Sequence, residues 1–106
     1  MPTRRLALCL VLIASPALAE TELPDQTTGA VYLLGEPANG EVALTSKADG
    51  EMDSFVLKAD CYAEHPIYGL GAWQMVDGGW RIMVQGSQIV SFEGTAPLDN
   101  PACVPQ

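Results

Sequence analysis

Few side chains in this sequence are of a type that does chemistry. His65 is the one histidine, so a histidine-based metal site would need thiols or carboxylates beside it. The nearest thiol, Cys61, is expected to be oxidised, and we interpret His65 as an ordinary loop residue. The sequence has no G-x-S-x-G motif, no P-loop and no cysteine nucleophile. We therefore expect no enzyme, no cofactor and no metal site.

The acidic residues are the other candidates. Carboxylates at alternate positions of residues 49–53, with Asp60 at the twelfth position, follow the spacing of a calcium-binding loop. The sixth position is Ser54, where such a loop needs glycine, and residues 55–58 have a strand pattern. We interpret Asp49-Gly50 as a solvated hairpin turn. Some pair among the 13 acidic residues could serve glycoside hydrolysis, but a domain this small offers only a shallow cleft.

The first 19 residues have the composition of a secretory signal. Residues 4–5 are both arginine, residues 6–14 are apolar, and residues 17–19 read Ala-Leu-Ala, a small-residue cleavage motif. From Glu20 onward three basic residues face 13 acidic ones, a net charge of −10, which argues against nucleic acid binding. The apolar run of nine residues is short of the ~20 needed to span a bilayer. We expect a periplasmic or secreted protein with no membrane span.

Short segments rich in Val, Ile, Tyr, Trp and Phe alternate with glycine and proline, which is typical of β-structure. We predict six strands, at residues 30–34, 41–46, 54–58, 72–76, 80–84 and 88–92. Asp77-Gly78-Gly79 predicts a hairpin turn. Residues 59–70 lack alternation and are predicted to be a loop, with one helical turn before Pro66. The predicted fold class is all-β, a small antiparallel up-and-down β-barrel or sandwich with one disulfide.

Two cysteines remain once Cys9 is removed with the signal, so one intramolecular pairing is possible, Cys61 with Cys103. Small exported domains commonly add such a bond to a limited core. We expect a monomer with the following organisation: a signal at 1–19, an N-terminal segment without strand pattern at 20–28, a β-barrel domain at 29–95 and a proline-rich strap at 96–106.

Most aromatic side chains fall in the predicted strands. We interpret four of them as core residues rather than as a ligand cage: Phe55, Trp73, Trp80 and Phe92.

Several short motifs follow one another in an order that resembles a known family. They are Leu23-Pro24, then Thr28-Gly29 before an aromatic strand, Ser54-Phe55-Val56-Leu57 before Cys61, Trp73, the Gly78-Gly79 turn and Ile89-Val90-Ser91-Phe92. Over residues 23–92 the sequence resembles the alkaline proteinase inhibitor family, periplasmic inhibitors of serralysin-type zinc metalloproteases. The family's usual first cysteine has no counterpart in residues 40–44, so Cys61 would pair with Cys103 instead.

The resemblance implies a function. A rigid barrel would present the mature N-terminal segment to the cleft of a zinc metalloprotease of serralysin type, through Glu20, Thr21, Glu22, Leu23 and Pro24. The free α-amine would approach the active-site zinc in place of the catalytic water. The alternative is a small exported β-barrel binding module that holds an apolar ligand or caps an envelope protein partner without inhibiting a protease. A cavity inside the barrel would favour this alternative.

Overall fold

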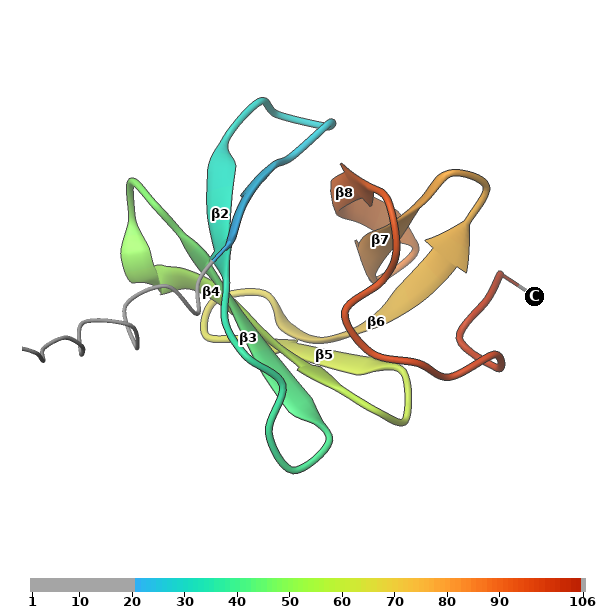
Figure 1. Cartoon of the computed structure of the whole chain (residues 1–106). Helices are drawn as coiled ribbons and strands as arrows, with labels where there is room; N and C mark the ends of the chain where they lie inside the picture. The colour runs from blue at the N-terminus through green and yellow to red at the C-terminus, as the bar shows by residue number, and fades with distance from the viewer. Residues whose placement is uncertain (1–20, 106) are drawn as a thin grey trace, which may run out of the picture.

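The computed structural model describes residues 21–105, which form one sheet of eight strands curled into a nearly closed barrel (Figure 1). Residues 1–20 and Gln106 lie outside the described part, and with them the predicted signal and Glu20. The strands are β1 (Thr21–Pro24), β2 (Val31–Leu34), β3 (Glu41–Ser46), β4 (Gly50–Lys58), β5 (Tyr62–His65), β6 (Gly69–Val76), β7 (Gly79–Val84) and β8 (Ser87–Glu93).

The strands lie in the sheet in the order of the sequence, each antiparallel to the next. Two of the connections are two-residue turns. Asp77-Gly78 joins β6 to β7, and Gln85-Gly86 joins β7 to β8 with φ of 52° and 82°. Two consecutive left-handed residues are the geometry of the commonest hairpin turn. The predicted antiparallel up-and-down barrel is confirmed.

Alternation along the strands fills the barrel interior. In β7 every second residue is buried, beginning with Trp80. The four predicted core aromatics are each at most 3% exposed: Phe55, Trp73, Trp80 and Phe92. The indole N–H of Trp73 donates a hydrogen bond of 2.7 Å to the carbonyl oxygen of Lys58, which satisfies its one polar group. The interior is therefore occupied by packed side chains.

Two strands lie where the sequence predicted none. β1 occupies part of the N-terminal segment 20–28, and all four of its residues lie opposite β2. β5 occupies the predicted loop 59–70, where turns and strand stand in place of the helical turn. β2 is equally short but reads VYLL, whereas β1 and β5, TELP and YAEH, have few β-branched or aromatic residues to mark a strand. In β5 the two inward residues are Ala63 and His65, one small and one polar, so its inward positions do not stand out as apolar in the sequence.

The seam between the edge strands β1 and β8 is closed by a buried carboxylate. Asp25 directly follows β1 and is 1% exposed. Its carboxylate accepts hydrogen bonds from the backbone N–H of Ser91 at 2.8 Å and of Thr27 at 2.9 Å. The backbone N–H of Gln26 also donates to the carbonyl oxygen of Ser91, at 2.7 Å. The two bonds to Ser91 engage backbone groups at the edge of β8 that would otherwise pair with a neighbouring strand.

After β8 the chain continues as an irregular strap, residues 94–105, beside β6 (Figure 1). The backbone N–H of Met75 donates to the carbonyl oxygen of Cys103 at 2.7 Å. The predicted disulfide between Cys61 and Cys103 is confirmed, and the two Cα atoms lie 5.3 Å apart. Leu98 packs against the core. The strap is thus attached to the barrel by both covalent and apolar contacts.

Alternate turns of an antiparallel meander lie at the same end of the barrel. One end, which we call the turn end, carries the turns at residues 25–30, 47–49, 66–68 and 85–86. The other, which we call the strap end, carries the start of β1, the strap and the turns at residues 35–40, 59–61 and 77–78. The two ends are linked on one side by β1, since Glu22 in this strand forms an ion pair with Lys47 in the 47–49 turn.

Candidate functional site

A buried histidine organises the turn end. His65 is the last residue of β5, and its side chain is 2% exposed. Its Nδ1 accepts hydrogen bonds from the backbone N–H of Ile67 at 3.0 Å and of Tyr68 at 3.2 Å. Its ring lies between those of Phe55 and Tyr68, with centroid distances of 4.6 and 4.4 Å. The interpretation of His65 as an ordinary loop residue is wrong, since the turn at 66–68 folds around its ring.

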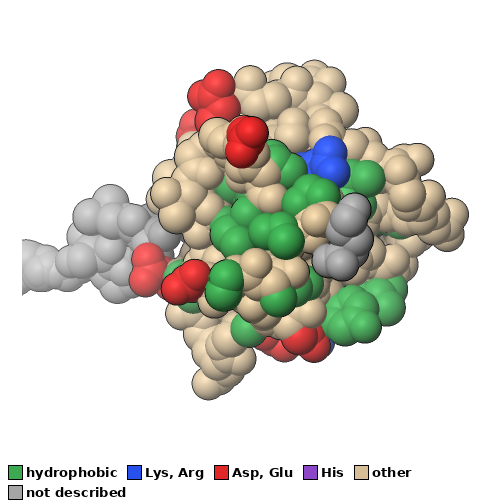
Figure 2. Space-filling model, turned by 90° about the vertical axis from the view of Figure 1, so that its right-hand side faces the viewer, with side chains coloured by type: hydrophobic (Ala, Val, Ile, Leu, Met, Phe, Trp, Pro, Cys, Tyr) green, Lys and Arg blue, Asp and Glu red, His purple; other side chains and the backbone are tan. Residues whose placement is uncertain are grey.

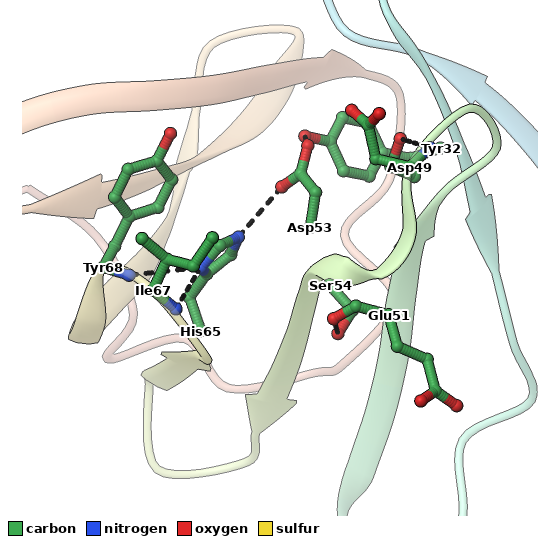
Figure 3. A network of polar contacts seen from close by, with 9 residues as sticks. Tyr32, Asp49, Glu51, Asp53, Ser54, His65, Ile67 and Tyr68 are labelled. Atoms are coloured by element: carbon green, nitrogen blue, oxygen red, sulfur yellow. Dashed lines mark hydrogen bonds and ion pairs between the residues drawn. The ribbon is translucent and has the colours of Figure 1, made fainter.

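Asp53 on β4 joins this histidine to Tyr32 on β2 (Figure 3). Its Oδ1 lies 2.9 Å from Nε2 of His65, and its Oδ2 accepts a hydrogen bond of 2.7 Å from the Tyr32 hydroxyl. Because Nδ1 of His65 accepts two N–H groups, the ring proton resides on Nε2 and is donated to Asp53. Burial, and then the adjacent Asp53 carboxylate, raise the pKa of Tyr32 above its ordinary value of about 10. The phenol is therefore a neutral donor at physiological pH.

The network leaves one group with capacity for a further partner. Both ring nitrogens of His65 are engaged, so this arrangement has no lone pair on the ring to take a proton from a bound molecule. The Asp53 side chain is 28% exposed, and each of its oxygens accepts one hydrogen bond from the network. A carboxylate has about four lone-pair positions, so Asp53 can accept further hydrogen bonds from outside.

A surface depression of about 340 Å³ lies over this network. Its lining includes Asp49 and Met52 from the β3–β4 hairpin, and Ile67 and Tyr68 from the β5–β6 turn. Met52 is 66% exposed, Ile67 65% and Tyr68 48%. The turn end therefore combines exposed apolar side chains with the carboxylates of Asp49 and Asp53, which makes it a candidate binding site.

The predicted inhibitory residues lie elsewhere. β1 holds four of the five, Thr21, Glu22, Leu23 and Pro24, while Glu20 lies outside the described residues. Leu23 is the one partly buried residue of β1, and Glu22 forms an exposed ion pair of 2.6 Å with Lys47. The prediction that this segment lacks strand structure is wrong. Its role in a protease cleft stays a prediction.

A second apolar area lies at the strap end. Figure 2 views the side of the molecule where β6 and the strap run, and hydrophobic side chains gather across it with acidic ones near its margin. Met75 and Val76 line two open depressions there, of about 360 and 500 Å³, the second completed by Val104 and Pro105. These depressions are on the surface, whereas the barrel interior is packed.

Sequence reasoning missed the burial of two polar residues at the turn end, Asp25 and His65. Asp25 reads as the first residue of a polar turn, and its partner Ser91 is 66 positions away. One signal was present for the histidine. Pro66, Ile67 and Tyr68 form an apolar run in a segment without strand pattern, where turns are usually polar.

Comparisons with family models, with curated proteins and with solved structures found no match for this chain. Within residues 21–105, no three or more His, Cys, Asp and Glu side chains gather so as to hold a metal ion. The same stretch of the chain contains no helix long and apolar enough to cross a bilayer. The fold and the site define this molecule as a disulfide-bonded up-and-down β-barrel with a charged, apolar-rimmed depression at one end.

Proposed function

We propose that this chain is an exported inhibitor of a zinc metalloprotease of serralysin type, whose mature N-terminal segment enters the protease cleft. The observation that supports the proposal is the attachment of β1. Among residues 21–105 this strand pairs only with β2, along four residues, and three of the four are exposed. The next residue, Asp25, closes the seam to β8 independently of β1. β1 can therefore leave the sheet without opening the barrel.

The segment has the reach and the chemistry that this mechanism requires. Five extended residues, 20–24, span about 17 Å. If the signal is cleaved after residue 19, the chain begins with an α-amine that has a pKa near ~7.7. Its unprotonated form is a nitrogen donor of the kind that zinc binds. Below that pKa the amine has no free lone pair, so we expect inhibition to weaken as the pH falls.

A cross-strand lock on β1 tests the proposal directly. Glu22 and Leu33 lie opposite each other on β1 and β2, so the double variant Glu22→Cys/Leu33→Cys should form a disulfide that holds β1 in the sheet. We expect the locked protein to lose inhibition of a serralysin-type protease. The matched variant Glu22→Ser/Leu33→Ser cannot form the bond and should still inhibit. Undiminished inhibition by the locked protein would contradict the proposal.

Assays against a panel of proteases test whether the protein inhibits any protease at all. The purified mature protein should inhibit serralysin-like proteases and leave serine and cysteine proteases unaffected. Acetylating its α-amine should weaken the inhibition while every side chain is retained. A mature protein that inhibits none of the zinc proteases tested would refute this function and leave the second candidate below.

The second candidate is a binding module for an exported protein partner, without protease inhibition. It is favoured by the exposed apolar side chains at the turn end, Met52, Ile67 and Tyr68. The packed interior supports a protein partner over an apolar ligand, since the core side chains occupy the volume that a ligand would need.

A further inference from the structure

We infer that the depression at the turn end is a docking site for a basic side chain, an arginine flanked by apolar residues, presented by a protein partner. This inference deepens the second candidate function and does not depend on protease inhibition. It rests on three features of the turn end: how firmly its apolar residues are held, which charges it carries, and how the two are arranged.

The apolar residues of the β5–β6 turn are held in place. Its backbone is fixed by the two hydrogen bonds to Nδ1 of His65, and the Tyr68 ring lies against the histidine. The histidine is in turn fixed by Asp53 and Phe55. An exposed apolar turn tethered to a buried polar network loses little conformational entropy when it binds a partner. This preorganisation distinguishes it from scattered apolar residues on a mobile loop.

The depression carries negative charge that no basic residue of the described chain neutralises. Asp49 and Asp53 both line it, and His65 is in its neutral form as the donor to Asp53. Residues 21–105 contain three basic side chains, none of which lines the depression, and each has other partners. Lys47 pairs with Glu22, Lys58 with Glu41 and Glu64, and Arg81 with Gln74 and Gln88. The partner therefore has to bring the positive charge.

The arrangement suits an arginine with apolar neighbours. Figure 3 shows Asp53 directed between Tyr32 and His65, with Ile67 and Tyr68 across from the β3–β4 hairpin. A guanidinium can donate two parallel hydrogen bonds to a carboxylate and lie on a tyrosine face, while its methylene stem covers apolar side chains. The volume of about 340 Å³ is at the small end for ligand pockets, ~300 Å³ and above, and is enough for one side chain.

Other occupants fit less well. A second copy of this chain would have to release one of its own basic side chains from the pairs just described. A metal ion would find only two carboxylates there. An apolar ligand would remove water from both carboxylates without offering them a hydrogen bond, which costs free energy.

The test is a nuclear magnetic resonance titration of the ¹⁵N-labelled mature protein with a defined peptide. The probe is acetyl-Gly-Leu-Arg-Leu-Gly-amide, and the control peptide has glutamate in place of arginine. We expect the arginine peptide to shift amide signals of residues 49–53 and 65–68, with a Kd of about 1 mM, as befits a single anchored side chain. The glutamate peptide should leave these signals unchanged.

Matched variants localise the effect. Asp49→Asn removes a lining carboxylate that is outside the hydrogen-bond network of His65, and should weaken binding at least about threefold. Glu51→Gln removes an exposed carboxylate on the same hairpin that does not line the depression and points away from it in Figure 3, and should have no effect. Ile67→Ser should weaken binding through the loss of apolar contact.

Four outcomes would overturn the inference. The first is no shift at these residues at about 10 mM arginine peptide, and the second is an equal response to the glutamate peptide. The third is that calcium ions alone produce the same shifts at micromolar concentration, which would indicate a cation site. The fourth is that the same signals move with protein concentration in the absence of peptide, which would assign the surface to self-association. None of these peptide titrations measures protease inhibition, so their failure and the failure of the protease assay are distinguishable.

Discussion

At the scale of single residues, Asp25 joins the two edges of the barrel. Its carboxylate is buried and accepts a hydrogen bond from Ser91 across the seam, and two more from Thr27 and Thr28 in its own turn. A buried acceptor with several donors is costly to remove, because the donors are then left without partners. The residue thus has a structural role that its position in a polar turn does not suggest.

Replacing this carboxylate should loosen the seam. We expect Asp25→Ala to lower the free energy of unfolding by about 2–4 kcal/mol, measured by urea denaturation, because three N–H groups lose their acceptor. Asp99→Ala removes an exposed carboxylate on the strap and should change it by less than about 0.5 kcal/mol. Equal effects of the two substitutions would mean that Asp25 does not close the barrel.

Tyr32 gives a prediction about alkaline pH. Its pKa is raised in the folded protein by burial and by Asp53, whereas in the unfolded chain it has the ordinary value of about 10. A group whose pKa is higher in the folded state contributes stability fully below its unfolded pKa, and that stability is lost as the pH rises further. Thermal melts between about pH 9 and pH 11 should show a falling Tm. The fall should be shallower in Tyr32→Phe, and an unchanged slope would contradict the assignment.

At the scale of elements, β1 is the least firmly held strand. It is four residues long, pairs on one side and anchors mainly through Leu23. Its position differs from the sequence prediction of a free segment, so removing it should have some effect on stability. The barrel itself should survive, because the seam is closed one residue beyond the strand.

Truncation separates these two expectations. Deleting residues 20–23 from the mature protein should lower Tm by about 5–10 °C, which corresponds to a loss of 1–2 kcal/mol in a domain of this size. The far-ultraviolet circular dichroism spectrum should retain its β-sheet form. Loss of the folded spectrum would show that β1 is needed for the barrel, and an unchanged Tm would show that β1 contributes nothing to it.

At the scale of the whole molecule, two devices hold a small acidic barrel together. One is the packed interior, with aromatic side chains from β4, β6, β7 and β8. The other is the Cys61–Cys103 bond, which ties the strap to the barrel across 42 positions of sequence. Closing a loop of this length removes conformations from the unfolded chain, with a stabilising effect of at most about 4 kcal/mol.

The disulfide can be tested without leaving a reactive thiol. The double variant Cys61→Ala/Cys103→Ala should unfold at a lower urea concentration, with a free energy of unfolding reduced by about 2–4 kcal/mol. Intact-mass analysis of the wild-type protein should show the loss of two hydrogens relative to the reduced chain. A free thiol at either cysteine in exported protein would contradict the assignment.

The sequence by itself determined the class of fold and much of the core. Alternation and turn residues predicted the hairpin at 72–84, because its strands are long enough for the pattern to repeat. Burial of Trp73 and Trp80 follows from the same alternation. The partner of Cys61 followed from counting, since one other cysteine lies outside the predicted signal.

Only the tertiary structure decided what lies at the seam and at the turn end. β1 is a strand because it pairs with β2. The sequence of its four residues does not show this pairing. The contact of Asp25 with Ser91 joins positions 66 residues apart, and the one of Asp53 with His65 joins two different strands. Such contacts depend on how the sheet curls and on register between distant strands, and neither leaves a local pattern in the sequence. In the sequence, a polar residue that will be buried cannot be told from one that will be exposed. The positions of the surrounding strands decide which it is.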